Sequence, residues 1–114
     1  MSFPVLKIGD VTARIPIVQG GMGVGISLSG LASAVANEGG IGVIAGAMIG
    51  MNEPNRCKDP VGADNTALRR EIREARAKTG GLLGVNLMVA LSNFSQLVQT
   101  SLEEKIDIIF SGAG

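Results

Sequence analysis

The chain lacks the features that would tie it to nucleic acid, an oxidising compartment or a membrane. Its 114 residues contain no Trp, Tyr or His, and ten Lys and Arg balance ten Asp and Glu. Without a net positive field or base-stacking rings, nucleic-acid binding is disfavoured. The single cysteine, Cys57, excludes an internal disulfide, and neither a signal-peptide pattern nor a run of roughly 18 apolar residues is present. We therefore expect a cytoplasmic protein with no membrane partner.

Aliphatic side chains must build the core, because aromatic residues are scarce. Hydrophobic residues make up 46% of the chain and aromatic residues only 3%, so Val, Ile, Leu, Ala and Met must fill the interior. This composition is typical of α/β proteins. The 17 glycines fall in short clusters beside apolar runs, which indicates turns and not a disordered tract.

Strand patterns and helix patterns alternate along the chain. Short apolar runs bounded by turn residues predict four strands, at about residues 15–19, 41–45, 83–89 and 106–110. Because helical patterns separate them, right-handed crossovers and a parallel sheet are expected. Both an open sheet and a barrel fit this order. A (β/α)8 barrel takes roughly 250 residues, so this chain would supply only part of one.

Helical spacing predicts three helices, at residues 29–38, 64–78 and 93–102. The expected N-caps are Ser27 or Ser29, then Asp64, then Asn93. In the second helix, Glu74 and Lys78 have the spacing of a favourable ion pair. In the third, four side chains are expected to face inward: Phe94, Leu97, Val98 and Leu102. Residues 46–63 lack periodicity and predict a long surface loop.

A glycine cluster follows the first predicted strand, in residues 19–25. Glycines let the backbone approach a flat ligand or a phosphate, because no Cβ stands in the way. The cluster does not have the spacing of a dinucleotide fingerprint, and the one near match, residues 40–45, opens a strand instead of a helix. No Gly-Lys pair of a Walker loop occurs. A tight turn and a ligand loop both fit the cluster.

Asn86 is a polar amide inside an otherwise apolar strand. Burying an amide without partners costs about 1 to 3 kcal/mol, so Asn86 should have a defined hydrogen-bond partner. Asn86 and Met88 point to the same side of the strand, and in a barrel that side faces the ligand mouth. A bond to neighbouring backbone and a contact with a ligand are both open.

Four blocks of sequence, in order along the chain, resemble the nitronate monooxygenase family, formerly called 2-nitropropane dioxygenases. The blocks are residues 16–22, 31–44, 84–88 and 111–114. They are also similar to a close relative, the FMN-type enoyl-acyl-carrier-protein reductase. The resemblance implies that residues 1–114 are a partial FMN-binding domain, the N-terminal (βα)3β half of a TIM (β/α)8 barrel with parallel strands. The flavin contacts that it implies are Gly20, Gly21, Met22, Gly23, Asn86 and Met88.

The same resemblance supplies no catalytic residue. In the family, the catalytic histidine and the loops that hold the FMN phosphate lie in the later half, and this chain has no histidine. Asp107 is expected at the end of its strand away from the mouth, and Glu103 and Glu104 are expected to be solvated. Cys57 has no histidine to activate it. We nominate no catalytic residue and no metal ligand.

Three functions follow as expectations for the intact protein. The first is an FMN-dependent oxidoreductase that oxidises alkyl nitronates, as small-molecule substrates, with dioxygen. The nearest alternative is reduction of an enoyl thioester by a nicotinamide through the same flavin. A hypothesis of another class is a non-catalytic half-barrel that associates into a homo-oligomer through its open strand edges.

Overall fold

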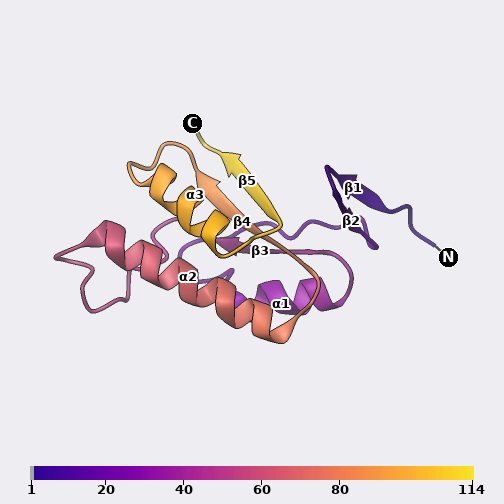
Figure 1. The fold of residues 1–114 in the computed structure, drawn as a ribbon, viewed down its shortest axis with the longest axis horizontal. Coiled ribbons are helices and arrows are strands. Elements are labelled where there is room, and N and C mark those ends of the chain that lie inside the picture. Colours follow the sequence, from indigo (N-terminus) through magenta and orange to yellow (C-terminus); the bar gives the residue numbers. More distant parts are fainter. Residues whose placement is uncertain (1) are drawn as a thin grey trace.

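A computed structural model describes residues 2–114 as three helices and two small sheets. The elements are β1 (Leu6–Ile8), β2 (Val11–Ala13), α1 (Ser29–Asn37), β3 (Ile41–Ala45), α2 (Pro60–Lys78), β4 (Leu82–Met88), α3 (Phe94–Glu103) and β5 (Ile108–Gly112). An antiparallel hairpin joins β1 to β2, and a parallel sheet has the order β3-β4-β5. The three helices pack against the parallel sheet, and the hairpin lies away from them (Figure 1).

Three of the four predicted parallel strands are present, which confirms the α/β fold. β3 spans the predicted residues 41–45, and β4 begins one residue earlier than predicted. β5 begins two residues later, because Ile106 N still donates to Ser101 O at the end of α3. In the ladder, Ala45 pairs with Asn86, which pairs with Phe110 on its other side.

The two faces of the parallel sheet pack against different neighbours, because side chains alternate along each strand. The face toward the helices carries the main core, which includes Ile44, Leu68, Ile72, Leu83, Val85, Leu87 and Leu97. The opposite face carries a smaller cluster, formed by Ala13, Ile41 and Val43 with Leu6, Ile8, Leu82, Ile108 and Phe110. The second face also carries Asn86, because Asn86 alternates with Val85 and Leu87.

The strand predicted at residues 15–19 is reduced to a single parallel bridge beside β3. Only Val18 forms a bridge, to Ile41, with Ile41 N donating to Ile17 O and Gln19 N to Ile41 O. Pro16 has no N–H for a ladder. The next ladder position is taken by a side chain, because Gln19 Oε1 accepts from Val43 N at 2.9 Å and Gln19 Nε2 donates to Val43 O at 3.1 Å. The backbone therefore leaves the sheet directly after Gln19.

The β1–β2 hairpin is an element that the sequence reading missed. Each strand has three residues, too few for a clear alternation, and Gly9 takes a left-handed φ of 55° in the turn between them. Ala13 is buried against Ile41 and Val43. The hairpin thus covers the amino-terminal part of the sheet face opposite the helices.

The N-cap predictions for the first two helices were wrong. Leu28 occupies the N-cap of α1 and makes no side-chain cap, while Ser29 N donates to Glu71 of α2 at 3.0 Å. Asp59, not Asp64, caps α2 by accepting from Gly62 N. Pro60 follows that cap, in a first turn where a missing N–H costs little.

The ends of α1 and α3 agree better with the sequence. Gly39, which follows the C-cap residue Glu38 of α1, has the expected left-handed φ of 96°. Asn93 is the N-cap residue of α3, but its side chain makes no cap hydrogen bond and donates instead to Asp64. Leu102 is 59% exposed, so the prediction that it faces inward was wrong. No helix within residues 2–114 is long and apolar enough to span a membrane.

Ion pairs join α2 to the end of α3. Arg69 contacts both Glu103 and Glu104 at 2.8 Å, and Arg73 Nε lies 2.6 Å from Glu104 Oε1. Glu104 is therefore a bridging residue whose side chain is only 11% exposed, and not the solvated residue that was expected. Glu74, which was expected to pair with Lys78, instead accepts a hydrogen bond from Ser29 Oγ of α1 at 3.2 Å.

Candidate functional site

The predicted flavin contacts gather at the carboxyl end of the parallel sheet. The glycine loop follows Gln19, Gly46 follows β3, and Met88 ends β4. Gly46 N donates to Asn86 O at 2.9 Å, which joins the ends of β3 and β4. In parallel α/β folds, ligands bind at this edge, where the loops after several strands meet.

Gly21 and Asn86 touch each other, although 65 positions separate them in the numbering. A Cβ added to Gly21 would lie 2.9 Å from Asn86 Cβ and 3.1 Å from its Oδ1. Contacts this short do not occur between real Cβ atoms, so the loop must carry glycine here. The structure thus brings together two of the sequence motifs that were singled out separately.

Asn86 has the defined partner that was expected of it. Its Nδ2 donates to Phe110 O on β5 at 3.2 Å. Its other amide atom, Oδ1, accepts no hydrogen bond from residues 2–114. Met88 lies on the same strand face, is 37% exposed, and pairs in register with Gly112. One acceptor is thus open beside the glycine loop, and one apolar side chain is partly exposed at the end of the same strand.

Ser27 closes the glycine loop. Its hydroxyl accepts from Met22 N at 2.9 Å, its N–H donates to Met22 O at 2.9 Å, and its carbonyl accepts from Ala45 N at 2.9 Å. Ser27 is 1% exposed and caps no helix, so the prediction of a capping role was wrong. Sequence reasoning considered Ser27 only as a helix cap and Gln19 only as part of a strand and of the glycine cluster. It missed that these two side chains fix the two ends of the loop.

The loop leaves several backbone donors free. Among the described residues, no acceptor takes the N–H of Gly20, Gly21 or Gly23. Met22 is 58% exposed. A Cβ at Gly20 would meet nothing within 4 Å, and one at Gly23 would lie 3.6 Å from Ala47 O, an ordinary contact. Gly21 is therefore the one predicted contact residue for which the fold itself demands glycine.

Residues that could act as bases lie away from this edge. Asp107 is at the amino end of β5, where its carboxylate accepts from Arg76 and from Leu83 N. Cys57 is exposed in the loop between β3 and α2. Within residues 2–114, no group of three or more potential metal-ligating side chains occurs. The site offers binding groups, and the structure nominates no proton acceptor in it.

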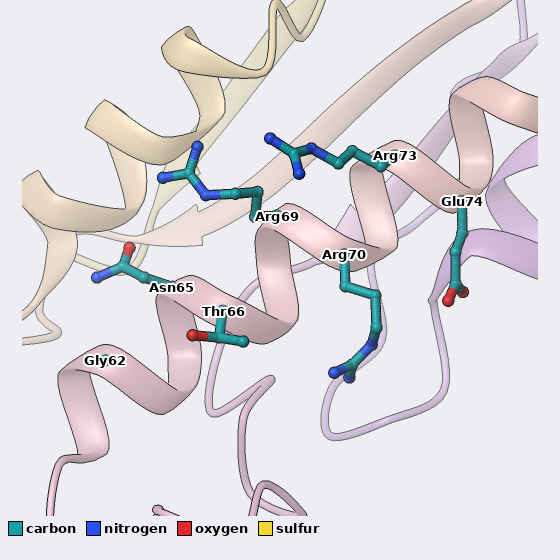
Figure 2. Close-up of a pocket in the computed structure, with 7 residues that line it drawn as sticks. All are labelled: Gly62, Asn65, Thr66, Arg69, Arg70, Arg73 and Glu74. Carbon is teal, nitrogen blue, oxygen red and sulfur yellow. The ribbon is translucent and has the colours of Figure 1, made fainter.

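A hollow of about 520 Å³ lies along α2, away from the edge of the sheet where the predicted flavin contacts gather (Figure 2). Three arginines line it, but each is paired: Arg69 with Glu103 and Glu104, Arg73 with Glu104, and Arg70 with Glu53. These hydrogen bonds raise the pKa of each guanidinium above its usual value. The arginines therefore form ion pairs between elements, and none of the described residues that line the hollow is an unpaired cation.

Comparisons with known proteins relate this chain to a family and to solved structures of the same fold. The family model for nitronate monooxygenase matches residues 6–108. The structure of FabK from Thermotoga maritima is similar, with a TM-score of 0.68 and 30% identity over 90% of this chain and 28% of FabK. A mutant form of that FabK gives a TM-score of 0.59 and 32% identity over 77% of this chain and 25% of the mutant chain. No curated protein matches the chain.

This chain therefore spans about a quarter of the length of the structures that it resembles. Its parallel sheet and helices correspond to part of a TIM barrel. Family members, including FabK, are oxidoreductases, and the family is of the FMN type. The chain belongs to the nitronate monooxygenase family, close to FabK.

Proposed function

We propose that the protein containing this chain is an FMN-dependent oxidoreductase that oxidises alkyl nitronates with dioxygen. The contact between Gly21 and Asn86 carries the proposal, because it places open donors and an open acceptor together at the ligand edge of the sheet. These N–H groups lie on exposed residues, so a ligand resting against this edge could reach them together with the open amide oxygen of Asn86. Family membership supports the same cofactor.

The residues at this edge suit a flat heteroaromatic ring. The N–H groups of Gly20, Gly21 and Gly23 would donate to ring oxygen and nitrogen atoms, and Asn86 Oδ1 would accept from a ring N–H. Exposed Met22 and Met88 would supply apolar contact to the ring. When bound, FMN would supply the redox chemistry, and these residues would hold and orient its ring.

A second candidate function is reduction of an enoyl thioester by a nicotinamide. The similarity to FabK favours it, at 30% identity over 90% of this chain. Residues 2–114 contain no group that separates the two reactions, because both would use the same flavin edge. Only an activity assay with each substrate can therefore distinguish nitronate oxidation from enoyl-thioester reduction.

The test uses the purified protein with FMN added and the unbound excess removed. The proposal expects flavin absorbance that stays with the protein, and dioxygen uptake that depends on an alkyl nitronate. Nicotinamide oxidation that depends on an enoyl thioester, without nitronate activity, would favour the second candidate. A colourless oligomer that FMN cannot titrate would contradict both and support the self-associating half-barrel.

A further inference from the structure

Asp64 is buried within α2, although the sequence placed it at the start of the helix. Asp64 is only 4% exposed. A buried carboxylate is stable only when donors satisfy its oxygens. Asp64 has three donors, and none of them comes from a capping position of its own helix. The carboxylate therefore connects α2 to other parts of the chain.

Two of the donors belong to the loop between β3 and α2, residues 46–59. Gly50 N donates to Asp64 Oδ1 at 2.9 Å, and Arg56 Nη1 pairs with the same oxygen. This loop lies tightly against the helix, because a Cβ on Gly50 would lie 2.3 Å from the carbonyl carbon of Ala63. If the loop moved away, the buried carboxylate of Asp64 would lose two of its three donors. Such movement is strongly disfavoured, because a buried charge without partners is costly.

The third donor belongs to the loop between β4 and α3, residues 89–93. Asn93 Nδ2 donates to Asp64 Oδ2 at 2.9 Å, and Asn93 is 7% exposed. One carboxylate therefore binds both loops, one through each oxygen. The two loops are separate in sequence, and each begins at the carboxyl end of a parallel strand.

Both loops start beside the predicted flavin contacts. The first begins at Gly46, whose N–H bonds Asn86 O, and its Ala47 lies opposite Gly23. The second begins directly after Met88. We propose that Asp64 is a positioning residue that holds both loops in one arrangement and thereby fixes the flavin edge. The effect on flavin rests on the function proposed above, whereas the effect on the loops does not.

The test compares three variants of the flavin-loaded protein by peptide-resolved hydrogen exchange and by FMN affinity. Asp64→Asn keeps the size of the side chain but removes the charge and turns an N–H₂ toward a donor. Asn93→Ala removes a single donor and is the milder change. Thr100→Val removes the bond from Thr100 Oγ1 to Asn65 Oδ1, which joins α2 to α3 beside Asp64 but reaches neither loop, and is the control.

We expect Asp64→Asn to speed exchange about tenfold or more in both loops, and to weaken FMN binding several-fold. Asn93→Ala should speed exchange in residues 89–93 alone, and Thr100→Val in neither loop. General destabilisation would not give this pattern.

Loop exchange in Asp64→Asn that equals that of Thr100→Val would overturn the proposal. So would loosened loops with unchanged FMN affinity, in a protein that binds FMN. If Asp64→Asn does not fold, Asn93→Ala decides, and unchanged exchange in residues 89–93 would overturn the link. Failure of the unmodified protein to bind FMN would remove the flavin function but leave the loop measurement as a separate result.

Discussion

At the scale of single residues, Gly21 decides how closely the glycine loop approaches the sheet. We predict that Gly21→Ala weakens FMN binding about tenfold or more, equivalent to about 1.4 kcal/mol. The new Cβ would lie 2.9 Å from Asn86 Cβ, so the loop must shift away from the strand. Titration of apoprotein with FMN, followed by flavin fluorescence, measures the change.

Gly30→Ala is the matched control for this substitution. Gly30 lies in α1, and an added Cβ there would meet nothing within 4 Å. FMN affinity should be unchanged, and stability should rise by about 0.5 to 1 kcal/mol because alanine favours the helix. Equal FMN affinity in both variants would show that the contact between Gly21 and Asn86 does not shape the flavin edge.

Asn86→Ala tests the polar half of the same contact. It leaves Phe110 O without its side-chain donor and removes the open Oδ1. We expect a loss of about 1 kcal/mol in unfolding free energy and a larger, at least tenfold, loss in FMN affinity. Urea unfolding of the apoprotein and FMN titration separate the two effects. A stability loss with unchanged FMN affinity would assign Asn86 a structural role only.

Single residues were predictable only where their immediate neighbours in sequence were informative. Asn86 was singled out because an amide interrupts an apolar strand, and it has a partner as expected. Gln19 and Ser27 gave no such signal. The side chain of Gln19 pairs with Val43, 24 positions away, and the burial of Ser27 depends on β3 beneath it. Contacts of this kind exist only after the chain has folded.

At the scale of elements, α1 packs closely against β3 at Gly42. A Cβ on Gly42 would lie 1.8 Å from Ala32 O, which is helix backbone and cannot turn aside. We predict that Gly42→Ala destabilises the protein by about 3 kcal/mol or more, at the upper end of overpacking effects. Urea unfolding measures it. Gly80→Ala is the control, because an added Cβ there would meet nothing within 4 Å. Its unfolding free energy should stay within about 0.5 kcal/mol of that of the unmodified protein. Similar losses of stability in both variants would contradict the close packing of α1 on Gly42.

The link between α2 and α3 should depend on pH through Glu104. The hydrogen bond from Arg73, with that from Arg69, holds the pKa of the Glu104 carboxyl below its usual value of 4.5, against the opposing effect of burial. Because the folded pKa is depressed, its stabilisation is present above the unfolded pKa. It is lost as pH falls through the folded pKa.

We therefore predict that Glu104→Gln lowers the unfolding free energy at pH 7 by roughly 0.5 to 1 kcal/mol. The difference from the unmodified protein should shrink below about pH 4.5 and vanish in stronger acid. Urea unfolding at a series of pH values measures it. Glu103→Gln is the comparison, since the Glu103 side chain is 45% exposed and should contribute less. A difference between Glu104→Gln and the unmodified protein that is the same at every pH would exclude the charge as its cause.

Elements were predictable where a pattern was long and continuous, and their ends were not. The apolar runs that became β3 and β4 were unambiguous. The segment at 15–19 carries the same β-branched residues, yet it forms only one bridge. Pro16 has no N–H to donate, and the Gln19 side chain takes the ladder position at Val43 in place of backbone. Asp64 resembled a cap, but Asp59 and Pro60 form a better one further upstream. Asp64 instead accepts hydrogen bonds from Gly50, Arg56 and Asn93 in two loops, and these partners cannot be read from its neighbours in sequence.

At the scale of the whole molecule, the fold has one covered and one partly open sheet face. The helices bury Leu83, Val85 and Leu87, while the opposite face presents Asn86 and the half-buried Phe110. In a TIM barrel this second face is turned toward the interior. The order of elements fitted both an open sheet and a barrel, and the family resemblance implied the barrel. The similarity to FabK, over 28% of that chain, confirms that the sheet and helices correspond to part of a barrel.

The central claim is that this edge of the sheet binds FMN. The most direct measurement is the FMN content of the purified protein after loading and removal of free cofactor, by absorbance and by release on denaturation. We predict about one FMN per chain in the unmodified protein. The affinity for FMN should fall about tenfold or more in Gly21→Ala and stay unchanged in Gly30→Ala. Protein that stays colourless, or binds FMN equally well in both variants, would contradict it.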